Sequence, residues 1–249
     1  MRYWFIALLL MVLTGCVKSL GNDERLDVNF SFHERGFGAS NQELLKDDKF
    51  RSLKIEVQYM KGFKPDDDAI INMRKFLLQH LHKPKGISVA TKQIDPDAKR
   101  VLNLKDVKAI EKDHRSMYSY GDEITIYILY TNGEFENRKI LGQAYKNTSI
   151  VMYGKAIQKN SGTFRKRTRT DLETTILLHE MGHLLGLAKE GTLMYTNHID
   201  SNHKSHCEDT TCLMYYGIDI SEKAGPVIRR GVPQLDKECL FDLVANGGK

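Results

Sequence analysis

Long apolar runs, an excess of charge of one sign and internal repeats are all missing from this sequence of 249 residues. Its longest apolar run, residues 3–13, is shorter than the roughly 20 residues that a membrane-spanning helix needs. The formal net charge is only +5 and the charges are well mixed, so no nucleic-acid partner is expected. With 41% hydrophobic and 28% charged residues, the composition predicts a globular protein with one large or two small domains.

The N-terminus has the features of an export signal. Arg2 precedes the apolar run and Leu13-Thr14-Gly15-Cys16 ends it, which is the order of basic, apolar and small residues in a secretory signal. The tetrapeptide resembles the lipobox of bacterial lipoproteins, which implies cleavage before Cys16 and attachment of lipid to its sulfur. Acyl chains anchor such a protein without a transmembrane helix. An ordinary secretory signal, in which Cys16 is incidental, is the alternative.

This leader predicts an extracytoplasmic protein that is anchored by lipid to a bacterial membrane. Val17 follows the cysteine in place of the aspartate of an inner-membrane retention signal, so the outer membrane or the cell surface is favoured. Residues 16–48 are rich in Gly, Ser, Asn and charge and show no sustained period, as in a flexible tether. The sequence therefore predicts a signal peptide over residues 1–15, a lipidated tether over 16–48 and one folded domain over 49–249.

Strand and helix patterns alternate through the predicted domain. Residues 53–59 alternate apolar and polar side chains, as in a strand with one buried face. Residues 124–130 are almost all strand formers, as in a central strand that is buried on both sides. Further strands are predicted over 86–92, 140–145 and 149–153, and helices over 66–81, 104–115 and 234–246. This alternation predicts an α/β fold with a mixed, twisted sheet.

The strongest chemical signal lies on a predicted helix that begins at Thr170. Thr170 and Glu173 have the spacing of a capping box, and Gly186 suits the left-handed position that ends a helix. On this helix His179 and His183 are four residues apart, so both imidazoles lie on one face. Two histidines in this arrangement predict a zinc site.

Glu180 has the position of a catalytic base. It is turned by about 100° from His179, so it can approach a zinc-bound water without ligating the metal. Zinc lowers the pKa of such a water to about 7, and Glu180 is predicted to take its proton and deliver it to the leaving amine. An H-E-x-x-H pattern arises by chance in on the order of one such chain in a hundred. The capped helix and the export signal favour a catalytic zinc site over a structural histidine pair.

Residues 179–186 resemble the first part of the metzincin signature, H-E-x-x-H-x-x-G-x-x-H. Lys189 stands where the signature has its third histidine. Residues 206–214 are similar to the H-C-x4-C-x-M segment of archaemetzincins, as if about 17 residues had been inserted before the third ligand. The resemblance implies a single metzincin-like catalytic domain with an active-site helix. It also implies that His206 is the third zinc ligand and that Met214 lies beneath the metal.

The inserted segment leaves alternatives open. His198 and His203 compete with His206 for the third ligand position, and His206 is favoured because only it is followed promptly by a Leu-Met-Tyr turn. A tyrosine after the Met-turn stabilises the oxyanion in some metzincins, which implies that role for Tyr216 or Tyr215.

Three cysteines lie beyond the leader. In an oxidising compartment Cys207 and Cys212 are expected to form a disulfide that closes a small loop, with Cys239 as a buried free thiol on a helix. A disulfide between Cys239 and either of the other two stays open as an alternative. No C-x-x-C follows, so the second, cysteine-rich zinc site of archaemetzincins is not expected.

Together these patterns predict a membrane-anchored zinc endopeptidase that uses one catalytic Zn²⁺ to hydrolyse extracytoplasmic proteins or peptides. The chain is also similar, over most of its length, to a group of lipoprotein metalloproteases from Bacteroidetes-type bacteria. An extended substrate is expected to pair with an edge strand, predicted at residues 149–153. Two alternatives are a surface binding or scaffold lipoprotein with a structural zinc site and a zinc amidase that acts on cell-wall peptide.

Overall fold

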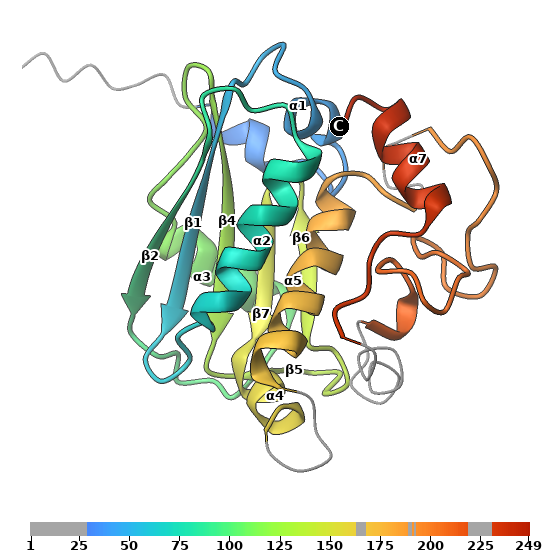
Figure 1. Cartoon of the computed structure of the whole chain (residues 1–249). Coiled ribbons are helices and arrows are strands. Elements are labelled where there is room, and N and C mark those ends of the chain that lie inside the picture. The colour runs from blue at the N-terminus through green and yellow to red at the C-terminus, as the bar shows by residue number, and fades with distance from the viewer. Residues whose placement is uncertain (1–28, 163–167, 189–190, 192, 219–230) are drawn as a thin grey trace, which may run out of the picture.

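A mixed sheet of five strands, in the order β2-β1-β4-β7-β6, lies at the centre of the molecule (Figure 1). The computed structural model describes residues 29–162, 168–188, 191, 193–218 and 231–249. The strands of the sheet are β1 (Ser52–Met60), β2 (Ile87–Ile94), β4 (Glu123–Thr131), β6 (Gly142–Lys146) and β7 (Ser149–Tyr153). Four of them are parallel, and β6 is antiparallel to β7. The predicted α/β class with a mixed sheet is confirmed.

Helices cover both faces of this sheet. Figure 1 shows α2 (Asp67–His80) and α5 (Arg169–Leu184) on one face and α3 (Leu104–His114) on the other. The smaller elements are η1 (Phe30–Glu34), α1 (Asn41–Leu45), β3 (Val101–Leu102), β5 (Glu134–Phe135), α4 (Gly154–Asn160), η2 (Tyr216–Ile218) and α7 (Lys237–Ala245). Among the described residues, no helix is long and apolar enough to cross a membrane.

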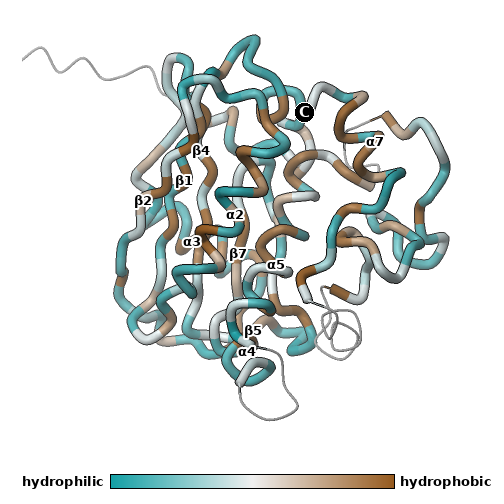
Figure 2. The backbone as a smooth tube through the Cα atoms, viewed as in Figure 1, coloured by the Kyte–Doolittle hydropathy of each residue, from teal (hydrophilic) through white to brown (hydrophobic). Residues whose placement is uncertain are grey.

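The two faces of the sheet differ in chemistry. Ile55 on β1 is paired with Ile126 on β4, and these side chains belong to the buried apolar core. One residue along, Glu56 is paired with Tyr127, so the opposite face carries buried polar groups. Hydrophobic colouring follows the strands in the middle of the molecule (Figure 2). The predicted full burial of the central strand is confirmed, because eight consecutive residues of β4 after Glu123 are buried.

Helix α5 begins differently from the prediction. Thr168, not Thr170, is the N-cap, and its side chain accepts a hydrogen bond from the backbone N–H of Asp171. The predicted capping box is wrong because Glu173 does not reach back to the N–H of the N-cap residue. It accepts instead from the N–H of Asp66 at 2.8 Å and from the side chain of Arg169 at 2.5 Å. Glu173 therefore ties the start of α5 to the start of α2.

The end of α5 agrees with the prediction. Gly186 has a φ of +82°, the left-handed conformation that glycine adopts without steric cost. The chain can therefore turn away from the helix directly after the histidine pair.

The segment before β1 is packed against the domain. The sequence predicted a tether up to residue 48, but residues 29–48 contain η1 and α1 and contact the turn between β6 and β7. Asn147 donates its N–H to the carbonyl of Arg35 at 2.9 Å, and Lys146 pairs with Glu34 at 2.6 Å. The described part of the predicted tether thus belongs to the folded domain.

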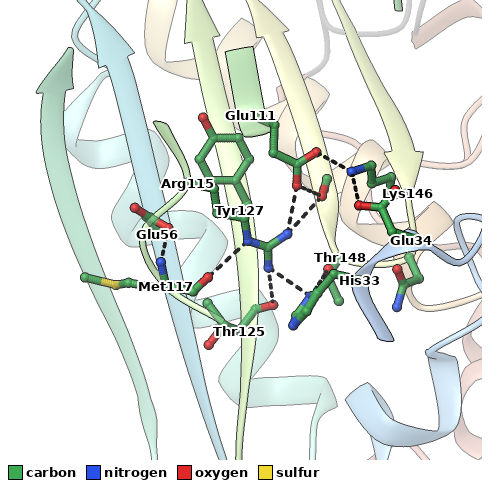
Figure 3. A network of polar contacts seen from close by, with 12 residues as sticks. His33, Glu34, Glu56, Glu111, Arg115, Met117, Thr125, Tyr127, Lys146 and Thr148 are labelled. Atoms are coloured by element: carbon green, nitrogen blue, oxygen red, sulfur yellow. Dashed lines mark hydrogen bonds and ion pairs between the residues drawn. The ribbon is translucent and has the colours of Figure 1, made fainter. Parts of the chain in front are cut away.

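A buried polar network joins this segment to the sheet (Figure 3). Arg115 pairs with Glu111 at 2.8 Å and donates to the carbonyl of Thr125 at 3.2 Å, while Glu111 also pairs with Lys146 at 3.0 Å. Arg115 also lies 3.0 Å from Nδ1 of His33, which is 1% exposed. Because each of these buried charges has a partner of opposite sign, the network can lie beneath the sheet without an uncompensated charge.

His33 is buried as a neutral imidazole. Its Nε2 accepts the N–H of Ser119 at 3.1 Å, and its Nδ1 lies 2.7 Å from the hydroxyl of Thr148 and 3.0 Å from the guanidinium of Arg115. Burial first, and then the nearby charges of Arg115 and Lys146, lower the pKa of His33 to about 3.

This lowered pKa predicts acid sensitivity. The folded state binds fewer protons than the unfolded state between about pH 6.5 and pH 3. His33 is therefore expected to reduce the free energy of unfolding by up to about 1.4 kcal/mol for each unit that the pH falls in this range. Urea unfolding at several pH values should show a weaker pH dependence in a His33→Gln variant than in wild type. The control is His82→Gln, which replaces an exposed histidine and should keep the wild-type pH dependence. An unchanged pH dependence in His33→Gln would contradict the assignment.

Candidate metal centre

Three histidines converge where α5 meets the segment before η2. Helix α5 places Nε2 of His179 and Nε2 of His183 3.1 Å apart, and both side chains are buried. His206 joins them, with its ring centroid 5.3 Å from that of His179 and 5.1 Å from that of His183. One ligand atom from each of the three lies within 4.8 Å of the other two. The structure thus brings together the three side chains that the sequence predicted as metal ligands.

The surroundings of His179 fit a metal ligand. Its Nδ1 lies 2.6 Å from the carbonyl oxygen of Leu213, an acceptor that places the proton on Nδ1 and leaves Nε2 to bind a metal. Zinc–nitrogen bonds of 2.0–2.1 Å at a tetrahedral ion would hold two nitrogens about 3.3 Å apart. The observed 3.1 Å between His179 and His183 is close to this separation. Three imidazoles with a fourth position open are the donor set of a catalytic zinc site.

The two competing histidines bind elsewhere. His198 contacts Asp242 at 3.0 Å through Nε2 and the sulfur of Cys207 at 3.4 Å through Nδ1. His203 contacts Asp200 at 3.0 Å through Nδ1. Among the described residues, therefore, the third position beside α5 is filled by His206.

Glu180 lies between the histidines and the sheet. It is 2% exposed, and its Oε2 accepts the backbone N–H of Ala144 on β6 at 2.6 Å. A pocket of about 180 Å³ opens beside it. The pocket is lined by Phe37, Ile140, Gly142, Gln143, Ala144, Glu180, His183, Lys204, Ser205 and His206.

The strand beside this pocket is β6. Residues 149–153, predicted as the edge strand, form β7 and pair with β4 on one side and β6 on the other. That prediction is wrong, because β6 turns back antiparallel to β7 and so occupies one edge of the described sheet. The unpaired side of β6 is the place where an extended peptide could add a strand next to Glu180.

Met214 lies directly against the active-site helix. A Cβ atom built on Gly182 would be 2.3 Å from the sulfur of Met214, so only glycine allows this approach. The backbone N–H of Cys207 donates to the carbonyl of Met214 at 2.8 Å. This bond fixes the residue after His206 to the turn that carries Met214.

Tyr216 is placed away from the predicted oxyanion position. Its ring is stacked on His203, with 3.4 Å between ring centroids, and it contacts Tyr215 edge to face. Neither tyrosine is among the described residues that line the pocket at Glu180. Hydrogen bonding with Tyr216 raises the pKa of Tyr215 to about 12.

Sequence reasoning missed Phe37 as a pocket residue. The ring of Phe37 contacts that of His183, with 5.9 Å between centroids, and forms one wall of the pocket. The available signal was an aromatic residue between Gly36 and Gly38 in an otherwise polar segment.

A second cluster of metal-binding side chains lies behind the first. The three cysteines beyond the leader are free and buried, so the predicted disulfide between Cys207 and Cys212 is wrong. One ligand atom from each of four residues lies within 4.8 Å of the others, and these residues are His198, Cys207, Asp236 and Cys239. Cys212 joins the cluster through Cys239, with 3.7 Å between the sulfurs.

The sulfur spacing fits a shared metal ion. A disulfide bond measures about 2.05 Å, whereas zinc–sulfur bonds of 2.3 Å at a tetrahedral ion place two sulfurs about 3.8 Å apart. The distance of 3.7 Å between Cys212 and Cys239 matches the second value. Hydrogen bonds among the three thiols lower the pKa of Cys212 to about 5 and raise the pKa of Cys239, so Cys212 is the first of these two to become a thiolate. This donor set is that of a closed, structural zinc site.

Comparisons with known proteins agree with this architecture. No protein-family model and no curated protein matches the chain. Among solved structures, the chain is similar to archaemetzincin from Methanopyrus kandleri, with a TM-score of 0.53 and 16% identity over 79% of this chain and 96% of that one. It is also similar to metalloproteinase-II from Bacteroides fragilis, with a TM-score of 0.46 and 13% identity over 88% of this chain and 58% of that one. The likeness to archaemetzincin shows that the chain shares the fold of that protein.

Proposed function

We propose that this chain is a zinc-dependent endopeptidase. The observation that carries the proposal is the convergence of His179, His183 and His206 beside the buried carboxylate of Glu180. Three protein ligands leave one position for water or substrate, whereas a structural zinc ion is enclosed by four. The metzincin-like fold and the resemblance of the sequence motifs to metalloproteases support the same activity.

The chain supplies the remaining parts of the reaction. When bound, a zinc ion supplies Lewis acidity that activates water and polarises a substrate carbonyl. Glu180 is the group that takes a proton from the attacking water and passes it to the leaving amine as the C–N bond breaks. The N–H of Ala144 holds the carboxylate of Glu180 at the pocket wall. The free side of β6 would hold the peptide extended beside it.

The second cluster supports a structural ion in the same chain. Its ligands come from the segment around His198, from the turn at Cys207 and Cys212, and from Cys239 on α7. An ion bound there would connect these three segments and fix the segment that carries His206. A scaffold protein with structural zinc alone would need the second cluster but not Glu180, so the open triad favours the enzyme.

The location of the protein is proposed from its leader. Cys16 lies outside the described residues, and we infer lipid attachment there from the lipobox-like tetrapeptide. The similarity to Bacteroidetes-type lipoprotein metalloproteases supports an extracytoplasmic site at the outer membrane or cell surface. Palmitate labelling of cells that express the full chain or its Cys16→Ala variant tests this anchor.

Zinc-dependent peptide cleavage tests the enzyme. Purified protein is expected to cut a mixed peptide library, to lose this activity on treatment with a zinc chelator and to regain it when zinc is restored. Mass spectrometry of the products gives the cleaved bonds, and isolated cell-wall peptide in parallel tests the amidase alternative. Protein that carries two zinc ions but cuts no peptide under any condition would support the scaffold function instead.

A further inference from the structure

A second, larger hollow lies next to the catalytic pocket. It has a volume of about 820 Å³ and is formed by part of the stretch between Gly186 and His206, which the metzincin signature predicted to be an insertion. Its lining includes the apolar residues Leu193, Met194, Tyr195 and Ile199 beside six polar ones. Lys204 and Ser205 also line the pocket at Glu180. The two hollows are therefore adjacent at these two residues.

The backbone of this segment is held in place by α7. Leu193 donates its N–H to the side chain of Asn246 at 3.1 Å and accepts from the same side chain at 2.9 Å. Tyr195 donates its N–H to the carboxylate of Asp242 at 3.0 Å. In Figure 1 this orange segment runs beside α7. The hollow is thus formed by a segment with fixed backbone contacts.

Two of the hollow's four apolar side chains are strongly exposed. Leu193 is 73% exposed and Tyr195 is 56% exposed, although their backbones are tied to α7. The ring of Tyr195 contacts that of Phe241 on α7 edge to face, with 5.4 Å between centroids, and Phe241 is itself 54% exposed. Exposed apolar side chains that gather in this way mark binding surfaces, whereas single ones do not. Ser205, at the junction of the two hollows, has a φ of +73°, a left-handed conformation that is uncommon for residues other than glycine. Strained backbone of this kind clusters at ligand-binding sites.

We propose that the two hollows form one peptide-binding cleft, and that the larger hollow selects an apolar or aromatic side chain of the substrate. This inference rests on the proposed peptidase function and adds its substrate preference. A peptide that passes Glu180 along β6 can reach the larger hollow because Lys204 and Ser205 border both. A Leu or Phe side chain placed there would be removed from water against Leu193 and Tyr195.

A peptide series tests this preference. Peptides that differ only in carrying Gly, Asp, Leu or Phe at one position are compared, one position at a time. At the substrate position whose side chain enters the larger hollow, wild type is expected to show a kcat/KM about tenfold higher for Phe or Leu than for Gly. The Leu193→Ser/Tyr195→Ser variant should lose this preference, mainly through a higher KM for the Phe peptide. Zinc content should not change.

The controls separate this inference from the function on which it rests. Ile71→Ser/Leu78→Ser removes two exposed apolar residues of α2 and should keep the preference. If wild type cuts no peptide, the proposed function fails. Fluorescence anisotropy of the same peptides on zinc-loaded Glu180→Gln protein still measures their affinity for the hollow. Equal affinity for the Gly and Phe peptides, or an unchanged preference in the double variant, would overturn the inference. Should the double variant fold poorly, Tyr195→Ser carries the same comparison.

Discussion

Replacing Glu180 with Gln is expected to lower kcat for peptide cleavage by about 10²- to 10⁴-fold, the usual contribution of a general acid–base group. Gln cannot take a proton from water at neutral pH, yet it has nearly the shape of Glu and its side-chain oxygen can still accept the N–H of Ala144. The three histidines are unchanged, so the variant should bind zinc as wild type does. Steady-state kinetics and metal analysis of the same preparation measure both quantities.

The matched control for this substitution is Glu208→Gln. Glu208 is an exposed carboxylate two residues after His206, so it reports the effect of removing one negative charge near the site. Activity should stay within about twofold of wild type, because exposed charges interact weakly through water. A Glu180→Gln enzyme that is as active as the Glu208→Gln enzyme would rule out Glu180 as the base.

Removal of the first metal site is expected to change activity, whereas removal of the second is expected to change thermal stability. His206→Ala should lower the zinc content from two ions per chain to one and abolish cleavage, with little change in Tm. Cys239→Ser should also leave one ion, but its loss should lower Tm by about 10 °C or more. Structural zinc contributes on the order of 10 kcal/mol in small domains, and each kcal/mol shifts Tm by about 2–4 °C at this chain length.

Metal analysis, calorimetry and kinetics on the same variants distinguish the sites. His203→Ala is the control, because His203 contacts Asp200 and lies outside both clusters, and it should keep both ions and full activity. A Cys239→Ser protein that retains two ions and the wild-type Tm would show that the cysteine cluster binds no structural metal. A His206→Ala protein with full zinc and activity would remove His206 from the centre.

The sequence predicted the parts of the centre that depend on local spacing. His179, Glu180 and His183 are neighbours on one helix, and helical geometry alone brings them together. Strands with strong periodic patterns were predicted within about two residues for the same reason, as β1 (Ser52–Met60) and β4 (Glu123–Thr131) show. Short elements such as β3 and β5 carry too few residues to form a pattern.

Long-range contacts were the parts that the sequence could not predict. The cysteine cluster joins residues that are up to 41 positions apart, and its clearest signal was Asp236 three residues before Cys239, in the spacing of C-x-x-C. The edge strand was misplaced because order along the chain does not determine on which side of β7 the preceding strand pairs. The polar composition of residues 29–48 indicated a tether because it does not reveal the partners that Lys146 and Asn147 provide.

The packing of residues 29–48 against the domain also limits how far the proposed enzyme can extend from a lipid anchor. With lipid on Cys16, only 13 peptide units separate the anchor from Asn29, the first residue that the structure describes. A chain of that length reaches at most about 45 Å when fully extended. Asn29 would then stay within this distance of the lipid surface, and the natural targets of the proposed enzyme would be proteins or peptides that come close to that surface.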